Sequence, residues 1–278
     1  MTTAACLLYT PGLDSRLSSW YLTRKKIPFF KCYVDINSRY SAIEKHLLKE
    51  WRNKNIIYVK GPDLSSLEDD LDAYIPNRNL LVATVAQSFT NCSTIYFSSV
   101  KDDRVPDSSL EFRESLSTCL SLSVTKKIYV DSVLYSKNKA DWVKYYAKVN
   151  PKRKITLLTR TYSCFSPFLS KNFIHYYYRR NGKLVKSSLT YPVLGCRSCK
   201  ACFRRFCALT AANIYVPLLD ENIYSYYYNE VVNNENNRRK MILRSKSRYN
   251  TIVDYLNTFY CTNKIDNNIN EVNYEDDE

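Results

Sequence analysis

The chain has 278 residues, of which 45% are hydrophobic and 24% are charged, and its formal net charge is +14. That length supports one or two domains with a sizeable buried core. Only 4 residues are glycine while 14% are aromatic, which excludes collagen-like and wholly disordered chains. No apolar run approaches the roughly 20 residues that cross a bilayer, and residues 1–9 lack the pattern of a secretory signal. We therefore expect a cytoplasmic protein with no membrane partner.

Short apolar runs alternate with helical patterns through the first half of the chain, which is typical of a parallel sheet with crossover helices. The predicted strands are 4–9, 29–34, 56–59, 94–98 and 128–130. The predicted helices are 15–24, 39–51, 77–89, 108–122 and 138–149. These five strand–helix units predict an α/β fold with a doubly wound, mostly parallel five-stranded sheet over residues 1–150.

The pattern changes after Pro151. Runs 173–178 and 183–189 flank Asn181-Gly182, which is a strong signal for a hairpin with a two-residue turn. A further helix is expected at 240–259. We therefore predict a second unit at residues 151–262, followed by an acidic, disordered tail at 263–278.

Positive charge is concentrated between Lys137 and Arg205. This stretch holds 17 Lys or Arg residues and a single acid, so the rest of the chain is close to neutral. Charge localised in this way indicates an anionic partner: nucleotide phosphates, a nucleic acid or an acidic protein face. The alternative is a solvated basic surface without a partner.

Three of the ten cysteines, Cys196, Cys199 and Cys202, lie within seven residues. In a reducing compartment such clustering more often binds metal than forms disulfides. A structural zinc ion takes four ligands in a tetrahedron, so a fourth thiolate must come from elsewhere, and Cys207 is the local candidate. The alternative is three cysteines on a helix with no metal.

Residues 10–15 stand between the first predicted strand and its helix. In a doubly wound sheet this position presents backbone N–H groups and a helix dipole to an anion. Asp14 and Ser15 are suited to orienting Mg²⁺ or a leaving group there. An Asp-Ser pair at a helix start also serves simply as an N-cap.

Several segments resemble, in chain order, the motifs of the 7-cyano-7-deazaguanine synthase family, a branch of the PP-loop ATP pyrophosphatases. Thr10-Pro11-Gly12-Leu13-Asp14-Ser15 resembles the Ser-Gly-Gly-x-Asp-Ser pyrophosphate loop, with Thr10 for serine and Pro11 for a glycine. Ile75-Pro76-Asn77-Arg78-Asn79 is similar to Val-Pro-Gly-Arg-Asn. Val105-Pro106-Asp107 with Glu111-Phe112 resembles the Tyr-Pro-Asp and Glu-Phe pair, and Asn138-Lys139-Ala140-Asp141 the Lys-Ala-Glu helix start.

The end of the matching region resembles the family's zinc site. It consists of Thr161-Tyr162-Ser163-Cys164 and the Cys196, Cys199 and Cys202 cluster, with Arg204 or Arg205 behind it. The resemblance therefore implies a small C-terminal zinc-binding subdomain on an adenine nucleotide alpha hydrolase-like fold. It implies one Zn²⁺ bound by Cys164, Cys196, Cys199 and Cys202.

The resemblance also implies a reaction. The family uses ATP and ammonia to convert 7-carboxy-7-deazaguanine into 7-cyano-7-deazaguanine through adenylation, which makes it a C–N ligase that feeds queuosine or deazapurine DNA modification. Implied catalytic residues are Asp14, Ser15, Arg78, Asp107 and Lys139. Implied contacts to ATP and Mg²⁺ are Thr10, Gly12, Leu13, Asp14, Ser15, Asp35 and Arg39. A compact chain rich in Tyr and Asn also looks like a product of an AT-rich phage genome.

A catalytically degenerate relative is the alternative interpretation. Proline has no N–H to offer a phosphate, and the segment from Asp35 to Arg39 lacks the glycine that the family carries there. With only 4 glycines, we expect several close backbone approaches to be lost. Such a protein would bind nucleic acid or an acidic protein through its basic zinc face, including Arg179, Arg180, Lys183 and Lys186 of the predicted hairpin.

Three implied residues also have a purely structural explanation. Arg78 could cap a surface, Asp107 could cap the helix that follows it, and Lys139 could be one more exposed charge. The oligomeric state is open, with a homodimer among the options.

Overall fold

The computed structural model describes residues 5–50, 55–69, 74–103, 105–154, 156–164, 199–212 and 214. It also describes the strands at 168–169, 177–180, 183–186 and 193–194, and short pieces between 225 and 257. The predicted tail at 263–278 and Cys196 lie outside the described residues, as does most of the helix predicted at 240–259.

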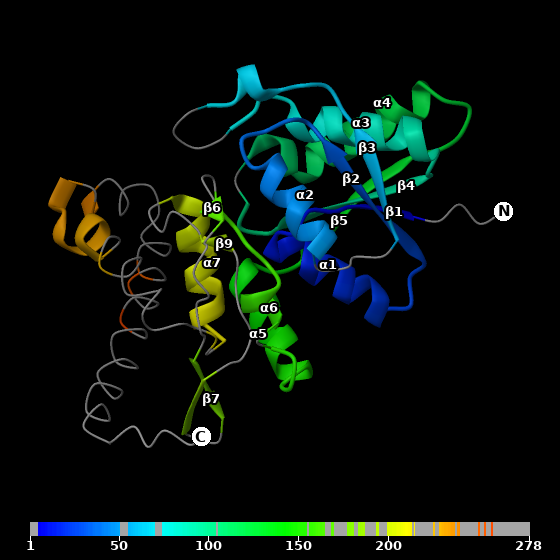
Figure 1. Ribbon diagram of the computed structural model, residues 1–278. Coiled ribbons are helices and arrows are strands. Elements are labelled where there is room, and N and C mark those ends of the chain that lie inside the picture. The colour runs from blue at the N-terminus through cyan, green and yellow to red at the C-terminus, as the bar shows by residue number, and fades with distance from the viewer. Residues whose placement is uncertain are drawn as a thin grey trace.

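A five-stranded parallel sheet forms the centre of the molecule, with strand order β3-β2-β1-β4-β5 (Figure 1). Its strands are β1 (Ala5–Leu8), β2 (Phe29–Asp35), β3 (Ile56–Lys60), β4 (Thr94–Val100) and β5 (Tyr129–Leu134). The predicted α/β fold is thereby confirmed. The strand order reverses between β1 and β4, and ligands of doubly wound sheets bind beyond the carboxyl ends of the strands at such a point.

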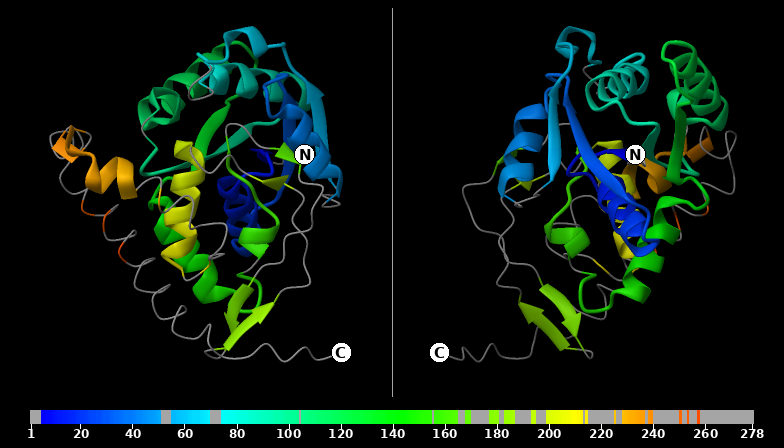
Figure 2. Two further views of the ribbon diagram at one scale, coloured as in Figure 1. Left: turned by 60° about the vertical axis from the view of Figure 1, so that its left-hand side comes forward. Right: turned by 90° about the vertical axis from the view of Figure 1, so that its right-hand side faces the viewer.

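Helices cover both faces of the sheet (Figure 2). The first face carries α1 (Leu13–Arg24), α2 (Ser41–Glu50) and α5 (Lys139–Val149), and the second carries α3 (Arg78–Thr90) and α4 (Leu110–Leu122). Each face has its own core. Leu13 and Leu17 of α1 pack with Trp142 of α5, whereas Ala83 of α3 packs with Cys6.

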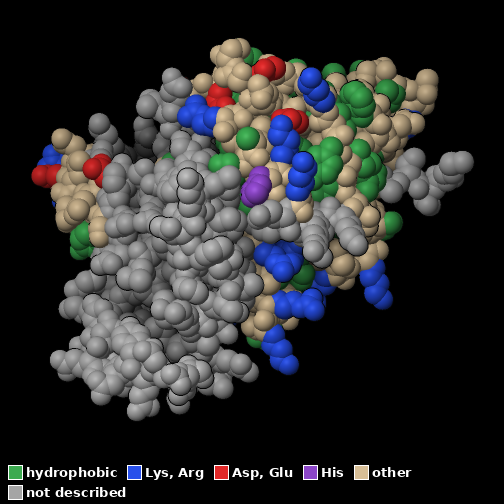
Figure 3. Space-filling model, in the orientation of Figure 1, with side chains coloured by type: hydrophobic (Ala, Val, Ile, Leu, Met, Phe, Trp, Pro, Cys, Tyr) green, Lys and Arg blue, Asp and Glu red, His purple; other side chains and the backbone are tan. Residues whose placement is uncertain are grey.

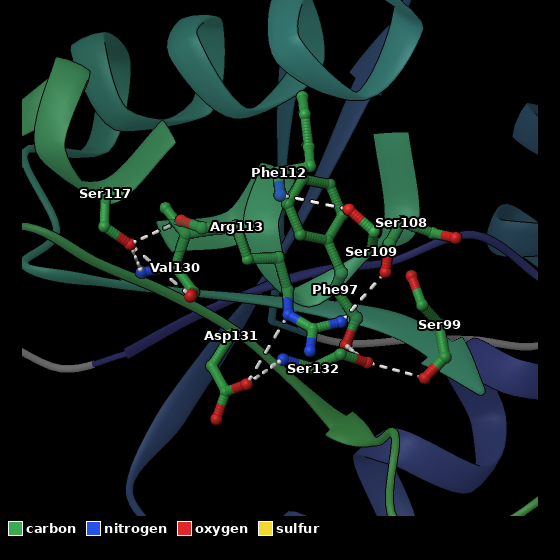
Figure 4. A network of polar contacts seen from close by, with 10 residues as sticks. All are labelled: Phe97, Ser99, Ser108, Ser109, Phe112, Arg113, Ser117, Val130, Asp131 and Ser132. Atoms are coloured by element: carbon green, nitrogen blue, oxygen red, sulfur yellow. Dashed lines mark hydrogen bonds and ion pairs between the residues drawn. The ribbon is translucent and has the colours of Figure 1, made fainter. Parts of the chain in front are cut away.

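The predicted run 128–130 covers only the first part of β5. The prediction stopped there because Asp131 and Ser132 interrupt the apolar pattern of the strand. The interior accommodates Ser132, whose hydroxyl donates to the Ser99 carbonyl at 2.6 Å (Figure 4). Two short 3₁₀ turns, η1 (Ser65–Leu67) and η2 (Pro106–Ser108), join the larger elements. Helix α4 begins after η2 because the Ser109 hydroxyl accepts from the Phe112 N–H and caps it.

The rest of the chain builds on the α5 side of the sheet. Helix α6 (Thr156–Thr159) leads to the paired strands β6 (Phe168–Leu169) and β9 (Val193–Leu194), and α7 (Lys200–Thr210) packs against α5. The predicted hairpin is confirmed as β7 (Tyr177–Arg180) and β8 (Lys183–Lys186), an antiparallel pair that projects away from the main sheet (Figures 1 and 2). A short π-helical segment, η3 (Asn229–Asn233), lies further along. Within the described ranges, no helix has both the length and the apolar character that crossing a bilayer requires.

Candidate active site and metal centre

Loop 10–15 lies at the carboxyl end of β1, at the switch point of the sheet. Its two hydroxyls fold the loop onto itself: Thr10 N–H donates to Ser15 Oγ at 3.2 Å, and Gly12 N–H donates to Thr10 Oγ1 at 3.3 Å. Gly12 precedes α1, whose first-turn N–H groups have no acceptor within the helix. A Cβ at Gly12 would lie 3.2 Å from Thr10 Oγ1, so the loop has little room for a side chain there.

Asp14 and Lys139 form an ion pair beside this loop. Lys139 opens α5 and is only 8% exposed, and its Nζ lies 2.7 Å from Asp14 Oδ2. The other carboxylate oxygen, Asp14 Oδ1, is buried without a hydrogen-bond partner. Burial raises the pKa of Asp14 and Asp103 adds to the rise, while Lys139 acts against it. An unpartnered, buried carboxylate oxygen beside free helix-start N–H groups suits a cation and phosphate oxygens.

Two carboxylates that follow β4 extend this pair into a charged network. Asp102 Oδ1 accepts from the Lys139 N–H at 3.0 Å, and Asp103 Oδ2 accepts from the Val100 N–H at 2.9 Å. Arg204 of α7 completes the network, with its Nη2 2.6 Å from Asp103 Oδ1 and 3.6 Å from Asp102 Oδ2. Burial alone would raise the pKa of Asp103, but the charges of Lys139 and Arg204 outweigh it and lower that pKa.

Arg78 and Asp107 belong to a second group at the start of α3. Asp107 accepts from the N–H of Asn79 at 3.4 Å, and its carbonyl accepts from the Asn79 side chain at 3.0 Å. The helix capped by Asp107 is therefore α3. The structural alternative, in which Asp107 caps the helix that follows it, does not hold, because Ser109 caps α4. Arg78 donates to the Tyr40 hydroxyl at 3.2 Å. Among the described contacts, none joins this group to Asp14.

Asp35 and Arg39 each have a partner of their own. Asp35 Oδ2 lies 2.6 Å from Lys45 Nζ, and Arg39 Nε lies 2.8 Å from Glu68 Oε1. Burial raises the pKa of Asp35, but its bonds with Lys45 and the Asn37 N–H outweigh burial, so this pKa is lowered. Both side chains hold the segment that leaves β2 in place.

The segment between Asp35 and Arg39 has a backbone conformation that favours glycine although it contains none. Asn37 has φ 56°, and Asn77, at the glycine of the resembled Val-Pro-Gly-Arg-Asn motif, also has φ 56°. Asparagine tolerates the left-handed region because its short polar side chain can bond locally. Both turns therefore keep a conformation that favours glycine, although a Cβ is now present.

Glu44 is a buried carboxyl that the sequence did not reveal. It lies in the first turn of α2, is 7% exposed, and has Tyr33, Tyr162 and Arg78 as neighbours. Burial raises its pKa to about 7, while these three neighbours act against the rise. Its position links α2 to Tyr162, whose backbone contacts loop 10–15.

Three cysteines meet to form a thiol cluster, which we define as Cys164, Cys199 and Cys202. Their sulfur atoms all lie within 4.8 Å of one another, a spacing that can hold a metal ion. Cys199 caps α7 and its sulfur accepts from the Cys202 N–H. Hydrogen bonds with Cys164 and Cys199, together with burial, raise the pKa of the Cys202 thiol. Cys207 lies buried elsewhere in the same hydrophobic core.

The structure thus brings Thr10, Gly12, Asp14, Ser15 and Lys139 together, and joins Cys164 to Cys199 and Cys202. Sequence reasoning missed Asp102 and Asp103. A signal was available, because these acids directly follow a predicted strand at the carboxyl edge of the sheet, where ligand-binding side chains gather. Nothing local in the sequence indicated that Arg204 reaches them, since it comes from an element about a hundred residues later.

The surface also carries a run of cations. Its described members, which we call the basic strip, are exposed or lie in exposed turns: Lys137, Lys144, Lys148, Lys152 and Arg153. None of them forms an ion pair with a described residue. On the face drawn in Figure 3, Lys and Arg side chains extend to the lower edge of the coloured part, whereas acidic side chains are seen only in its upper and far left parts.

Comparison with known proteins gives consistent matches. A family described as queuosine biosynthesis protein QueC matches residues 33–213, well over half of the chain. A 7-cyano-7-deazaguanine synthase of Methanocaldococcus jannaschii is 26% identical over 146 residues, which cover 51% of this chain and 54% of that protein. A protein of the same name from Methanococcus maripaludis strain S2 is 25% identical over 247 residues, which cover 77% of this chain and 97% of that protein. The protein of that name from strain C7 is 24% identical over 196 residues, which cover 66% of this chain and 75% of that protein.

Proposed function

The chain belongs to the queuosine biosynthesis protein QueC family, and from that premise we propose that it is an ATP-dependent 7-cyano-7-deazaguanine synthase. A carboxylate is a poor electrophile because its leaving group would be oxide. In the proposed reaction a carboxylate oxygen of 7-carboxy-7-deazaguanine attacks the α-phosphorus of ATP and pyrophosphate leaves. Ammonia then displaces AMP to give the amide. A second activation of the amide oxygen, with loss of AMP and two protons, gives the nitrile.

One observation carries this proposal: a hydroxyl-lined loop and the Asp14–Lys139 pair lie together at the switch point. Ser15, Thr10 and the helix-start N–H groups would bind the departing pyrophosphate. Lys139 would offset charge that develops on the phosphates, and the unpartnered Asp14 Oδ1 would bind Mg²⁺. We assign Arg78 and Asp107 to the substrate side, because they form a separate polar group at the start of α3.

The thiol cluster would hold Zn²⁺, with Cys196 as the fourth ligand. The donor set fits, since three thiols converge from two segments that are distant in sequence, and thiolates suit zinc. We place the ion in a structural role. Elemental analysis of the purified protein is expected to find about one equivalent of zinc. Less than half an equivalent, with all four thiols free to react, would contradict this assignment.

Asp14→Asn tests the catalytic site. This change keeps the shape of the side chain but removes its charge, and we expect a loss of at least about 100-fold in substrate-dependent pyrophosphate release. The matched control is Asp141→Asn, which removes the same charge from an exposed position in the first turn of α5 and should leave the rate unchanged. Equal, low rates from wild type and Asp14→Asn would contradict the proposal.

Pro11→Gly tests whether the altered loop limits the enzyme. Glycine restores a backbone N–H that proline lacks, and it keeps the carbonyl that accepts from the Tyr162 N–H at 3.2 Å. We expect a several-fold increase in pyrophosphate release. An unchanged rate in an active enzyme would show that the missing N–H is not aimed at the phosphates.

The basic strip favours a second candidate function, nucleic-acid binding. Lys144 and Lys148 are four residues apart and share one exposed face of α5, so a phosphate backbone could contact both. The side chains of the β7–β8 hairpin, which we predict to extend this surface, lie outside the described residues. This function is compatible with either an active or a degenerate site.

Salt dependence decides this candidate. We expect binding of a labelled oligonucleotide to weaken steeply with salt, and Lys144→Gln with Lys148→Gln to reduce the slope of log K against log salt by about two. The control, Lys127→Gln, removes an exposed charge at the opposite end of the sheet and should leave the slope unchanged. Absent or salt-independent binding would refute the candidate.

A further inference from the structure

Two separate contacts join the thiol cluster to the nucleotide site, one to loop 10–15 and one to the carboxylates that follow β4. The first runs through Tyr162, two residues before Cys164. Its N–H donates to the Pro11 carbonyl at 3.2 Å, and residues 12 and 162 form a parallel bridge. The second runs through α7, where Arg204 follows Cys202 by two residues and contacts Asp103 at 2.6 Å. Each segment that supplies a sulfur therefore also reaches the nucleotide site.

The ion pairs of Arg204 determine which carboxylate the Lys139 ammonium neutralises. Lys139 is buried beside two carboxylates that its ammonium can neutralise: it is paired with Asp14 at 2.7 Å and attracts Asp103, while Asp102 accepts from its backbone N–H. One ammonium cannot neutralise both acids. Because Arg204 takes Asp103 and also lies 3.6 Å from Asp102, the ammonium of Lys139 remains on Asp14.

We propose that metal binding at the thiol cluster raises the nucleotide affinity of loop 10–15, and that Arg204 is the positioning residue that carries much of this coupling. This inference rests on the proposed function, since it requires the loop to bind a nucleotide. A metal ion fixes the three sulfurs relative to one another, and so fixes both the segment that holds the loop and the helix whose Arg204 contacts the neighbouring carboxylates. The ordering of the loop is then largely complete before the nucleotide arrives, which strengthens binding.

Coupling of this kind is reciprocal: nucleotide must raise the metal affinity by the factor by which metal raises the nucleotide affinity. We expect a factor of at least about 5. The affinity for α,β-methylene-ATP with Mg²⁺, an analogue that cannot release pyrophosphate, is measured by calorimetry on the full chain with zinc and after chelation. The zinc affinity is measured separately, by competition with a chromophoric chelator, with and without the analogue. Both ratios should agree.

Arg204→Ala identifies the route of the coupling. The variant should still bind one zinc ion, but its nucleotide affinity should fall most of the way to that of the metal-free protein. Arg204→Lys should recover part of the loss because it restores the charge but not both contacts. Lys127→Ala, which removes an equal charge far from the site, should have no effect. Asp103→Asn removes the partner of Arg204 and leaves α7 unchanged, so it gives an independent reading if Arg204→Ala misfolds.

The outcomes separate this inference from the function beneath it. If zinc-loaded wild type binds no nucleotide, both the proposed function and the coupling are refuted. If it binds equally well with and without zinc, only the coupling is refuted. If coupling exists but Arg204→Ala and Asp103→Asn both retain it in full, the role of Arg204 is refuted.

Discussion

Asn77 shows how a single residue can replace a glycine without loss of the turn. Its φ of 56° lies in the left-handed region, which costs most residues roughly 1–2 kcal/mol but is tolerated by asparagine. We expect Asn77→Ala to lower the free energy of unfolding by about 1 kcal/mol and Asn77→Gly to change it by only a few tenths. Urea unfolding of the two variants measures the difference. Equal stability of both would show that the backbone relaxes when the residue is changed.

Glu44 predicts a dependence of stability on pH. Its pKa is raised by burial to about 7 from an ordinary value of 4.5, so the folded state retains a proton that the unfolded state loses between these values. Stability therefore falls as the pH rises from about 4.5 to about 7 and then levels off. Removing this carboxyl charge should therefore raise the free energy of unfolding increasingly across that range, and most above it.

Glu44→Gln is accordingly expected to stabilise the protein at pH 8 by up to about 3 kcal/mol relative to wild type, and to have little effect near pH 4.5. Urea unfolding at the two pH values checks this. A gain of the same size at both values would contradict it, because it would not depend on ionisation. Glu114→Gln, at an exposed glutamate of α4, serves as the control for the loss of one negative charge.

At the scale of elements, α4 protects the edge of the sheet. β5 is an edge strand, and two serines one turn apart on α4 accept from the backbone at its start. Ser121 Oγ accepts from the N–H of Ile128, just before the strand, and Ser117 Oγ accepts from the Val130 N–H, both at 2.8 Å. Figure 4 shows the Ser117 contact beside the buried Arg113, which donates to the Ser108 carbonyl. Exposed edge N–H groups invite pairing with other chains, and these serines satisfy two of them.

Ser117→Ala should leave the Val130 N–H without a partner and cost about 1–3 kcal/mol of stability. Thr118→Ala is the matched control. Its hydroxyl bonds only within α4, to the Glu114 carbonyl, and its side chain is exposed, so the change should be small. Urea unfolding midpoints compare the two. Similar losses from both variants would mean that the serine contact contributes nothing specific.

The elements themselves were predictable where the hydrophobic pattern was regular. The strands at β1 and β3 and the helices at α3 and α5 follow runs of apolar residues, and Asn181-Gly182 predicted the pairing of β7 with β8. The second half of β5 was not predictable, because Asp131 and Ser132 read as polar loop until Ser99 is placed opposite. The residues of the site were likewise predictable in part. Contiguous motifs showed the loop and the cysteines, but a contact between Asp103 and Arg204 depends on the tertiary fold.

At the scale of the whole molecule, one hydrophobic core crosses the predicted boundary at residue 150. It joins Leu17 and Trp142 from the sheet side to Leu157, Cys164 and Phe206 from the cysteine side. The division into units at 1–150 and 151–262 stays a prediction. A shared core is what the proposed coupling requires, because a metal site on an independent unit would have no packed route to the loop.

Isotope transfer tests the central claim, that this chain activates a carboxylate through ATP, most directly. The protein, loaded with zinc, is incubated with ATP, Mg²⁺, ammonia and 7-carboxy-7-deazaguanine that carries ¹⁸O in both carboxylate oxygens, and the products are analysed by mass spectrometry. Each activation transfers one carboxylate oxygen to AMP, so we predict two AMP molecules, each with one ¹⁸O, for every nitrile formed. Two results would contradict the account: AMP without ¹⁸O, or protein that binds ATP but forms no nitrile.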